Sequence, residues 1–344
     1  MNIIIDNAIP FIQGVFEDYA QVRYLDGGSI TAADVHDADA LVIRTRTKCG
    51  AALLEGSSVK VISTATIGYD HIDLEYCRKR GIHVQNASGC NSGAVMNYVL
   101  SAMYGTASRK RINLSGFKVG IIGVGSVGSR VARALTLLGF NVLQNDPPRA
   151  ANEGPAQFCD LDYLLRNSDV VTMHVPLTPE TRGMADAAFF SKMKLGAFFI
   201  NASRGEVVDE DALLHAVQKL GSVIIDTWCG EPYVNRELIK AVDIATPHIA
   251  GYSYQGKLVG TSMAVRAVAR YFGIKELYDF FPDPQDEPRD AVKLDLRNKT
   301  QGQITSILQY NYPIFTDDFM FRIAPENFES LRANYRYRRE FFID

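Results

Sequence analysis

The chain has 344 residues, of which 47% are hydrophobic and 22% are charged, and its formal net charge is −3. This composition is ordinary for a globular protein, and the length is sufficient for two or three domains with their own cores. The slightly acidic charge argues against a nucleic-acid partner, and no apolar run is long enough to span a membrane.

The cysteines and the N-terminus indicate a cellular compartment. The number of cysteines is odd, they lie far apart, and no C-x-x-C pair occurs. This distribution is typical of reduced thiols rather than of a disulfide framework or a zinc site. The N-terminal sequence MNIIIDNAIPF has no basic segment before its apolar residues, so it predicts a first strand and not a signal peptide. We therefore expect a cytoplasmic protein.

Short apolar runs alternate with helical patterns almost as far as residue 250. The predicted strands are residues 2–6, 40–45, 59–64, 82–86, 118–123, 141–146, 169–174, 197–203 and 222–226. Strands that alternate with helices at this spacing are typical of βαβ units, in which a parallel sheet is covered on both faces. These strands are too many for a single sheet. The sequence therefore predicts an α/β protein with two Rossmann-like, doubly wound parallel-sheet domains.

A long helical pattern at residues 91–109 separates the two groups of strands, and a second one spans residues 256–272. We expect the second helix to pack back on the first group, which makes the first domain discontinuous. The predicted boundaries are residues 1–92 with 253–278 for the first domain, and residues 93–252 for the second.

The composition and the hydrophobic pattern of the sequence change after about residue 276. Residues 279–290 are rich in Pro and Asp, which is typical of a linker. We predict strands at 292–297 and 319–323, and helices at 300–310 and 326–341. The sequence therefore predicts a small C-terminal α+β domain within residues 279–344.

The strongest motif lies at residues 118–149. Gly123, Gly125 and Gly128 form the pattern G-x-G-x-x-G between a predicted strand and an amphipathic helix, and the next strand ends at Asp146, 18 residues past Gly128. In a dinucleotide site the first glycine makes the tight turn, the second admits the pyrophosphate, and the third lets the helix pack closely. The helix N-terminus attracts the phosphates.

Asp146 favours NAD as the cofactor. Its carboxylate would accept hydrogen bonds from the ribose hydroxyls and would repel a 2′-phosphate. Arg149, three residues later, carries a positive charge that could bind a 2′-phosphate, so the sequence does not exclude NADP as the cofactor. The alternative is a glycine-rich turn in another kind of α/β protein, but the full strand–helix–strand–Asp context disfavours it.

Three charged residues follow predicted strands, whose carboxyl ends bind ligands in open α/β sheets. Arg204, Glu231 and His248 match the needs of 2-hydroxy acid oxidation. A histidine accepts the hydroxyl proton, a carboxylate orients the imidazole, and an arginine binds the substrate carboxylate with two donors. Alone, each could be a surface ion pair, a loop charge or a structural histidine. The scattered histidines, without H-x-H or H-E-x-x-H, predict no metal site.

Four stretches, at residues 120–142, 201–213, 226–232 and 246–252, resemble the D-isomer-specific 2-hydroxyacid dehydrogenases. The resemblance covers roughly residues 40–272. It implies NAD as the cofactor and Arg204, Glu231 and His248 as the catalytic set. It also implies that residues 1–92 with 253–278 form a substrate-binding domain and that residues 93–252 bind NAD.

Other stretches, at residues 3–11, 87–102, 145–150 and 248–261, are similar to one branch of this family, which acts on a phosphorylated 2-hydroxy acid and has an extra dimerisation domain. This likeness implies a homodimer formed through the C-terminal domain. The residues that it implies at the NAD site are Asp146, Val175, Ala202, Ser203, Asp226 and Gly251, and those that it implies at the substrate are Thr45, Thr66 and Tyr252, with backbone amides near Ile67 and Gly68.

The substrate phosphate needs positive charge. Arg44 and Arg46 are the candidates that follow a strand, with Lys48 and Lys257 as further ones, although each could equally be a solvated surface charge. The basic segment at 332–339 is expected on a solvated or dimer-facing surface. Two other functions stay open: a related dehydrogenase for phosphoglycerate, glyoxylate or hydroxypyruvate, and a non-catalytic NAD-sensing protein.

Overall fold

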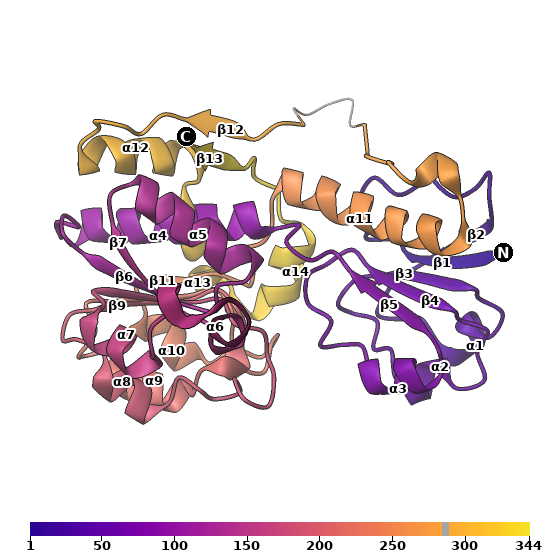
Figure 1. Cartoon of the computed structure of the whole chain (residues 1–344), viewed down its shortest axis with the longest axis horizontal. Helices are drawn as coiled ribbons and strands as arrows, with labels where there is room; N and C mark the ends of the chain where they lie inside the picture. Colours follow the sequence, from indigo (N-terminus) through magenta and orange to yellow (C-terminus); the bar gives the residue numbers. More distant parts are fainter. Residues whose placement is uncertain (284–288) are drawn as a thin grey trace. The chain divides into compact units, whose positions relative to one another are not determined.

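The computed structural model describes residues 1–283 and 289–344, and over these residues the chain divides into two compact units. Unit 1 consists of Met1–Asn91 and Tyr254–Asp290, and unit 2 of Ser92–Ser253 and Ala291–Asp344. Each unit has its own parallel sheet with helices on both faces (Figure 1). The predicted linker at 279–290 falls partly on residues 284–288, which lie outside the described residues.

Unit 1 contains a parallel sheet with the strand order β2-β1-β3-β4-β5. Its strands are β1 Asn2–Asp6, β2 Gln21–Leu25, β3 Ala40–Ile43, β4 Val61–Thr64 and β5 His83–Asn86. One face is covered by α11, and the other by three short helices (Figure 1). The helices are α1 Ala32–Val35, α2 Ala51–Leu54, α3 Leu74–Lys79 and α11 Tyr254–Phe272, followed by the 3₁₀ helix η3 Lys275–Leu277.

The core of unit 1 explains why α11 returns to it from so far along the chain. β3 and β4 are buried on both faces, so the first group of strands needs a helix above it as well as below. α11 supplies Val265, Val268 and Ala269, which pack against Ile3 and Val42 of the sheet. The predicted packing of residues 256–272 on the first group of strands is therefore found in the structure.

Unit 2 contains a parallel sheet with the strand order β11-β10-β9-β8-β6-β7. Its strands are β6 Lys118–Ile122, β7 Asn141–Asn145, β8 Val170–Met173, β9 Phe198–Asn201, β10 Ser222–Ile225 and β11 Ile244–Ala245. Because β7 and β8 lie on opposite sides of β6, the strand order reverses there, and a ligand of a doubly wound sheet binds at this position. The predicted fold class is confirmed.

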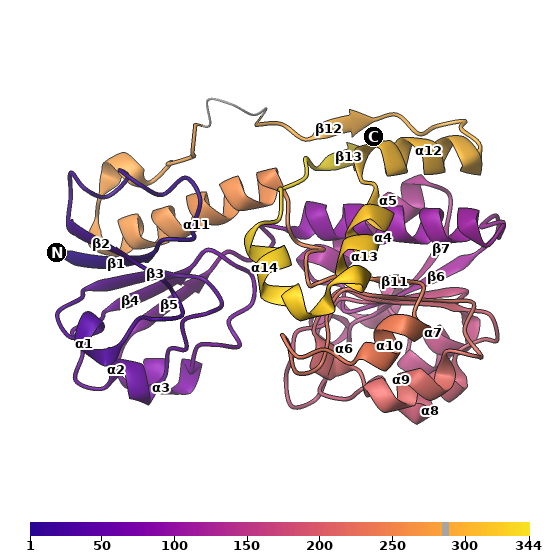
Figure 2. The same cartoon turned by 180° about the vertical axis from the view of Figure 1, so that it is seen from behind.

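Helices cover both faces of the unit 2 sheet (Figure 2). On one face lie α4 Ser92–Arg109, α5 Ser126–Leu137 and α12 Gln301–Asn311. On the other lie α7 Leu161–Asn167, α8 Ala187–Lys192, α9 Glu210–Ala216 and α10 Arg236–Ala241. The connections contain α6 Pro147–Glu153 and the 3₁₀ helices η1 Pro155–Gln157 and η2 Gly205–Val207.

The C-terminal segment shares the core of unit 2. Leu308 and Phe341 join the apolar cluster around α4, while Phe321 and Phe328 join the cluster on the opposite face, beside Trp228. The segment thus has no core separate from that of unit 2. Its remaining elements are β12 Val292–Leu294, α13 Ile314–Ile323, η4 Pro325–Asn327, α14 Phe328–Ala333 and β13 Phe341–Ile343.

Two predicted C-terminal elements are wrong. Residues 319–323 are not a strand but the end of α13, in which Asp318 and Phe321, three residues apart, are buried while Phe319, Met320 and Ile323 are exposed. The predicted helix at 326–341 ends at Ala333, and the chain continues in an extended form to β13, which pairs in parallel with β12. Three described strands were also missed: β2, an edge strand of exposed and half-buried residues, the two-residue β11, and β13.

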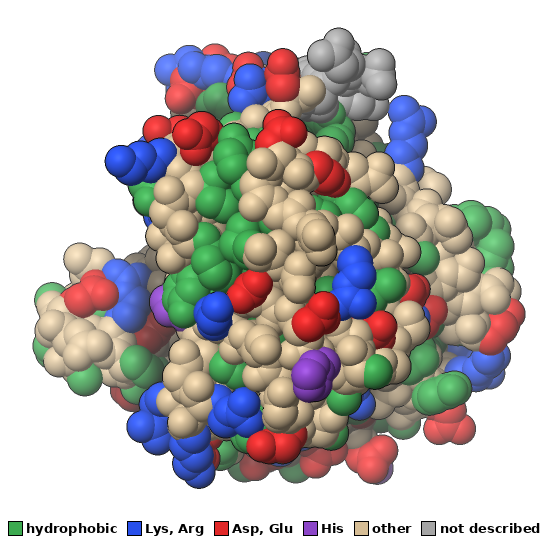
Figure 3. All heavy atoms as spheres, turned by 90° about the vertical axis from the view of Figure 1, so that its right-hand side faces the viewer, with side chains coloured by type: hydrophobic (Ala, Val, Ile, Leu, Met, Phe, Trp, Pro, Cys, Tyr) green, Lys and Arg blue, Asp and Glu red, His purple; other side chains and the backbone are tan. Residues whose placement is uncertain are grey.

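One face of the molecule is mixed in charge. On the face drawn in Figure 3, basic and acidic side chains are interspersed with hydrophobic ones. None of the described helices is both long enough and apolar enough to cross a membrane.

A half-buried histidine that directly follows β8 gives a first testable prediction. Nδ1 of His174 is buried without a hydrogen-bond partner, and burial lowers the pKa of His174 to about 3. The unfolded chain binds a proton at this residue near pH 6.5, whereas the folded chain does not. This contribution to stability is therefore complete above about pH 6.5, and it is lost by about 1.4 kcal/mol per pH unit as the pH falls toward 3.

We expect His174→Gln to flatten this loss, measured as the free energy of unfolding in urea at about pH 7.5 and about pH 5. The control is His215→Gln, because His215 is exposed on α9. An equal loss of stability on acidification in wild type and His174→Gln would contradict the assignment.

Candidate active site

The glycine-rich loop after β6 has the geometry that the motif predicts. Gly123 has a φ of +82°, and a side chain on it would meet the backbone of His174 at 2.8 Å. A Cβ on Gly128 would lie 2.0 Å from the carbonyl oxygen of Gly123, so only glycine lets α5 pack so closely on the loop. A Cβ on Gly125 would meet nothing within 4 Å, and Gly125 caps the N-terminus of α5. The loop thus leaves room for a phosphate where the helix dipole favours one.

Asp146 lies beside this loop at the end of β7. Its Oδ2 accepts a hydrogen bond of 2.8 Å from the Val124 amide, and its Oδ1 accepts one of 3.0 Å from the Arg149 amide. Each carboxylate oxygen can accept a second hydrogen bond, so the side chain is fixed in place and can still bind ribose hydroxyls.

The guanidinium of Arg149 forms hydrogen bonds that the sequence did not predict. Its guanidinium donates to both carboxylate oxygens of Glu153, and to the Val124 carbonyl at 2.6 Å. The hydrogen bonds that Arg149 donates to Glu153 raise the pKa of Arg149 and lower the pKa of Glu153. Because this fork occupies the guanidinium, Arg149 is less available for a 2′-phosphate than the sequence suggested.

Arg204 follows β9 in a tight loop. Asn201 holds this loop, since its Oδ1 accepts from the Ser203 amide and its Nδ2 donates to the Arg204 carbonyl at 2.9 Å. A Cβ on Gly205 would lie 1.9 Å from the backbone of Trp228, so the loop after β9 presses directly on the loop after β10. This close approach places Arg204 in the loop adjacent to the one that carries Glu231.

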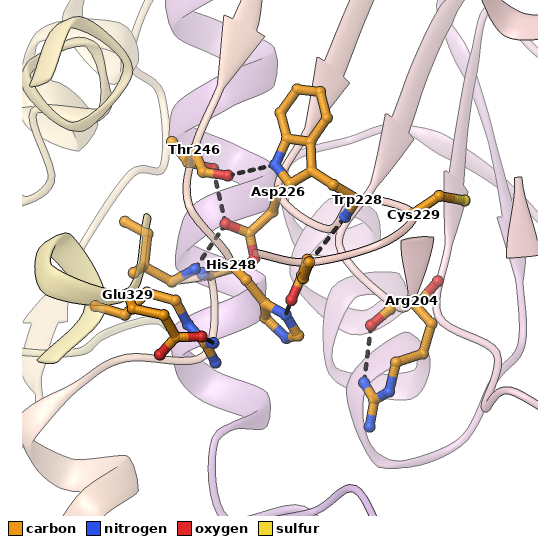
Figure 4. Close-up of polar contacts among 12 residues, drawn as sticks. Arg204, Asp226, Trp228, Cys229, Thr246, His248 and Glu329 are labelled. Carbon is orange, nitrogen blue, oxygen red and sulfur yellow. Dashed lines mark hydrogen bonds and ion pairs between the residues drawn. The ribbon is translucent and has the colours of Figure 1, made fainter. Parts of the chain in front are cut away.

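Asp226 organises the loop after β11. It is buried, and its carboxylate accepts hydrogen bonds of 2.7–2.9 Å from the Thr246 hydroxyl and from the amides of Ile249 and Ala250 (Figure 4). Burial raises the pKa of Asp226, and these donors, together with His248, oppose the rise. The carboxylate thus fixes the backbone on both sides of His248.

Glu231 and His248 are joined directly. Nδ1 of His248 lies 2.8 Å from Oε2 of Glu231, while Oε1 of Glu231 accepts from the Trp228 amide at 2.9 Å. Burial by itself would raise the pKa of Glu231, but His248, the Trp228 amide and Arg332 outweigh it and hold the pKa below its usual value. Glu231 is therefore ionised at neutral pH and can only accept hydrogen bonds.

The tautomer of His248 follows from this charge. Because ionised Glu231 can only accept, Nδ1 of His248 must donate, and the neutral imidazole then carries its free electron pair on Nε2. The backbone of His248 has a φ of +56°, a left-handed conformation that costs a non-glycine residue about 1–2 kcal/mol. The surrounding hydrogen bonds must therefore maintain this conformation.

The other predicted residues of unit 2 lie around the same strand ends. Val175 follows β8, where its side chain lies 2.9 Å from the Cβ position of Gly123. Ala202 and Ser203 precede Arg204, and the Ser203 hydroxyl donates to Asn201. Gly251 and Tyr252 lie near the end of the loop between β11 and α11, residues 246–253, which is called the His248 loop. The Tyr252 ring packs edge-on against those of Tyr335 and Tyr337.

The predicted substrate residues of unit 1 also gather at strand ends. Thr45 follows β3 and Thr66 follows the neighbouring β4. The Thr66 hydroxyl lies 2.7 Å from that of Thr64. Arg44 donates to the Ala8 carbonyl at 3.0 Å, whereas Arg46 and Thr45 are exposed. Over residues 1–283 and 289–344, no group of three or more His, Cys, Asp or Glu is arranged to hold a metal ion.

Sequence reasoning missed the C-terminal residues that contact the catalytic loops. The segment at 332–339 was expected on a solvated or dimer-facing surface, and this is wrong for two of its arginines. Arg338 donates to the carbonyls of Ile249 and Ala250, and the Arg332 guanidinium lies over the Tyr252 ring at 5.9 Å. No spacing in the sequence links these arginines to a loop so much earlier in the chain.

Comparisons with known proteins fit this geometry. The family described as D-isomer specific 2-hydroxyacid dehydrogenase, NAD binding domain, matches residues 96–250. An erythronate-4-phosphate dehydrogenase of Bacteroides fragilis is 42% identical to the chain, covering 99% of this chain and 97% of its own length. One of Cronobacter sakazakii is 39% identical and covers 99% and 92%.

The chain belongs to the D-isomer-specific 2-hydroxyacid dehydrogenases, in their erythronate-4-phosphate dehydrogenase group. The resemblance expected from the sequence is thereby confirmed, and so is NAD as the cofactor of this oxidoreductase.

Solved structures support the same fold. D-lactate dehydrogenase of Aquifex aeolicus, complexed with NAD and lactic acid, is 27% identical, covers 83% of this chain and 100% of its own, and has a TM-score of 0.65. The NAD⁺-bound 3-phosphoglycerate dehydrogenase of Entamoeba histolytica is 25% identical, covers 83% and 99%, and has a TM-score of 0.68.

Two glycine variants separate packing from cofactor binding. Gly128→Ala should cost about 1–3 kcal/mol in the free energy of unfolding, because its methyl group would collide with the backbone of Gly123. Gly125→Ala should cost no more than about 1 kcal/mol, the usual effect of alanine at an N-cap, since its φ of −72° is open to alanine and the Cβ position is free of contacts.

Gly125→Ala should nevertheless weaken NAD binding roughly tenfold or more, because the methyl group occupies space that the pyrophosphate needs. Urea unfolding and calorimetric titration with NAD measure the two effects. Unchanged NAD affinity in Gly125→Ala would remove the loop from the cofactor site.

Proposed function

We propose that the enzyme oxidises 4-phospho-D-erythronate to 2-oxo-3-hydroxy-4-phosphobutanoate with NAD, in the biosynthesis of pyridoxal 5′-phosphate (vitamin B6). The observation that carries the proposal is the bond between Glu231 and His248, in a chain that aligns almost end to end with erythronate-4-phosphate dehydrogenases. The name of those relatives supplies the substrate.

The reaction removes a hydride from C2 and a proton from the C2 hydroxyl. Bound NAD supplies the hydride acceptor. Nε2 of His248 accepts the hydroxyl proton, and Glu231 stabilises the imidazolium that results, because it stays ionised beside Nδ1. The catalytic pair thus carries out the proton transfer.

Other residues bind and orient the acid. In this account Arg204 binds the substrate carboxylate with two parallel N–H donors, helped by the backbone amides near Ile67 and Gly68. The remaining predicted contacts are Thr45, Thr66 and Tyr252 for the substrate, with Arg44 and Arg46 for its phosphate. Unit 1 is accordingly the proposed substrate-binding domain, and residues 93–252 the NAD-binding domain.

The quaternary structure is also a proposal: the enzyme forms a homodimer through its C-terminal segment, in the cytoplasm. On α13 the large apolar side chains of Phe319, Met320 and Ile323 are exposed, and Tyr310 of α12 is exposed as well. Contiguous exposed apolar side chains are typical of an interface. The described cysteines form no disulfide, in keeping with a reducing compartment.

A substrate panel tests the function. Reduction of NAD or NADP is followed by absorbance with 4-phospho-D-erythronate, 3-phosphoglycerate, D-lactate and D-glycerate, and the matching 2-oxo acids are run in reverse. Selective turnover of 4-phospho-D-erythronate with NAD is expected. Turnover of another acid alone would keep the mechanism and reject this substrate, and tight NAD binding without any turnover would favour an NAD sensor.

His248→Asn should lower turnover about 10²–10⁴-fold while NAD still binds, the usual effect of losing a general base. Asparagine is chosen because it tolerates the left-handed backbone better than other non-glycine residues. His215→Gln is the matched control. Normal turnover in His248→Asn would exclude the proposed proton transfer.

Phe319→Glu should convert the dimer to monomers, because the charge would be buried in the proposed interface. The control is Leu195→Glu, since Leu195 is 83% exposed and lies outside the C-terminal segment. Sedimentation equilibrium measures both. A wild-type monomer, or a Phe319→Glu dimer of unchanged affinity, would contradict the proposed interface.

A further inference from the structure

The peptide groups that follow His248 are held from two sides. The amides of Ile249 and Ala250 donate to the Asp226 carboxylate at 2.8 and 2.9 Å. The carbonyls of the same two residues accept from one guanidinium, that of Arg338, which donates to Ile249 at 3.0 Å and also to Ala250. Two charged side chains thus satisfy all four polar groups of this short stretch.

Arg338 is itself fixed within unit 2. Its guanidinium lies over the Tyr312 ring at 4.1 Å and donates to the Tyr335 hydroxyl at 3.1 Å and to the Ala94 carbonyl at 3.2 Å. The backbone of Arg338 forms an isolated β-bridge with Ser253. The arginine therefore links the start of α4, the C-terminal segment and the His248 loop.

Neighbouring contacts keep this part of the C-terminal segment in register. Asn97 of α4 donates to the Phe341 carbonyl at 2.7 Å and accepts from the Phe341 amide at 3.0 Å. The Ser253 hydroxyl donates to Glu340 at 2.6 Å. The chain just after Arg338 is thus anchored to α4 and to the end of the His248 loop.

We propose that Arg338 is a positioning residue, which acts through the backbone of residues 249–250 to hold the imidazole of His248 in its reactive orientation. His248 has a left-handed backbone, so its side-chain direction depends on the peptide groups that follow it. Without the guanidinium, the Ala250 carbonyl would lose the Arg338 donor and the Ile249 carbonyl would keep the Tyr252 amide as a donor, so the loop would be less tightly held. A displacement of about 1 Å at a reacting group can lower a rate about 100-fold.

This inference rests on the proposed function, and it assigns the C-terminal segment a role within its own subunit, apart from dimerisation. If the arginine only stabilises the fold, its replacement lowers the melting temperature and leaves kcat unchanged in the folded molecules. If the arginine positions His248, its replacement lowers kcat in molecules that remain folded and still bind NAD. The two roles therefore predict different measurements.

The test compares Arg338→Ala and Arg338→Lys with wild type, using 4-phospho-D-erythronate and NAD. Lysine keeps the charge and the stem, but it cannot donate to two carbonyls through a planar fork. We expect kcat to fall about 10–100-fold in both variants, with the NAD dissociation constant within about twofold of wild type. If Arg338→Ala does not fold, Arg338→Lys carries the test alone.

Two controls distinguish an effect on the position of His248 from an effect on the stability of the fold. Leu308→Ala lowers stability at a buried site of α12 in the same C-terminal segment, without touching the loop. We expect its kcat to match wild type at a temperature where it is folded. Guanidinium ions added to Arg338→Ala should restore part of kcat, whereas sodium chloride at the same concentration should not.

Unchanged kcat in folded Arg338→Lys would overturn the inference. So would an equal loss of kcat in Leu308→Ala. Failure of the wild-type enzyme to turn over 4-phospho-D-erythronate would count against the proposed function instead. In that case the same comparison is made with whichever acid of the panel the enzyme oxidises.

Discussion

The hydrogen bonds that Asp226 accepts fix the backbone of residues 246–250, and the orientation of His248 depends on them. A buried carboxylate is stable only when donors surround it, and here the Thr246 hydroxyl and two loop amides supply them. The same contacts maintain a left-handed histidine that would otherwise be disfavoured. The stability of the fold and the geometry of the site are therefore linked at this carboxylate.

Electrostatics then determines what the histidine can do. Glu231 is half-buried, and burial by itself would favour its neutral form, yet His248, the Trp228 amide and Arg332 keep its pKa low. An ionised carboxylate at Nδ1 leaves Nε2 as the base. The pair works like the carboxylate and histidine pairs of other enzymes: Glu231 sets the tautomer of the imidazole, and His248 transfers the proton.

Much of this arrangement could be predicted from the sequence. The glycine motif, Asp146 and the Arg204, Glu231 and His248 set follow local rules: each lies just after a strand, and strand ends converge in a parallel sheet. The predicted strands of both sheets are found, and their boundaries differ from the prediction by at most two residues. β2, QVRYL, was missed because it is a short edge strand with no apolar run and no fully buried residue.

The C-terminal segment could not be predicted in the same way. The short apolar run FMFRI is compatible with both a strand and a helix. In the structure it is helical, and its Phe321 ring packs against Trp228 and Phe328. Arg338 sits among other basic residues that suggest a solvated surface, and its contacts with residues 249–250 depend on tertiary structure alone. Long-range side-chain contacts of this kind leave no periodic signal.

The imidazole tautomer of His248 tests the central claim most directly. It is measured from the ¹⁵N chemical shifts of histidine-labelled enzyme with NAD bound, and the signal is assigned by its loss in His248→Asn. The account predicts a neutral ring with the proton on Nδ1 and an unprotonated Nε2, which changes in a Glu231→Gln variant. A neutral ring protonated on Nε2 in the wild-type enzyme would contradict the account, because that nitrogen could not accept the substrate proton.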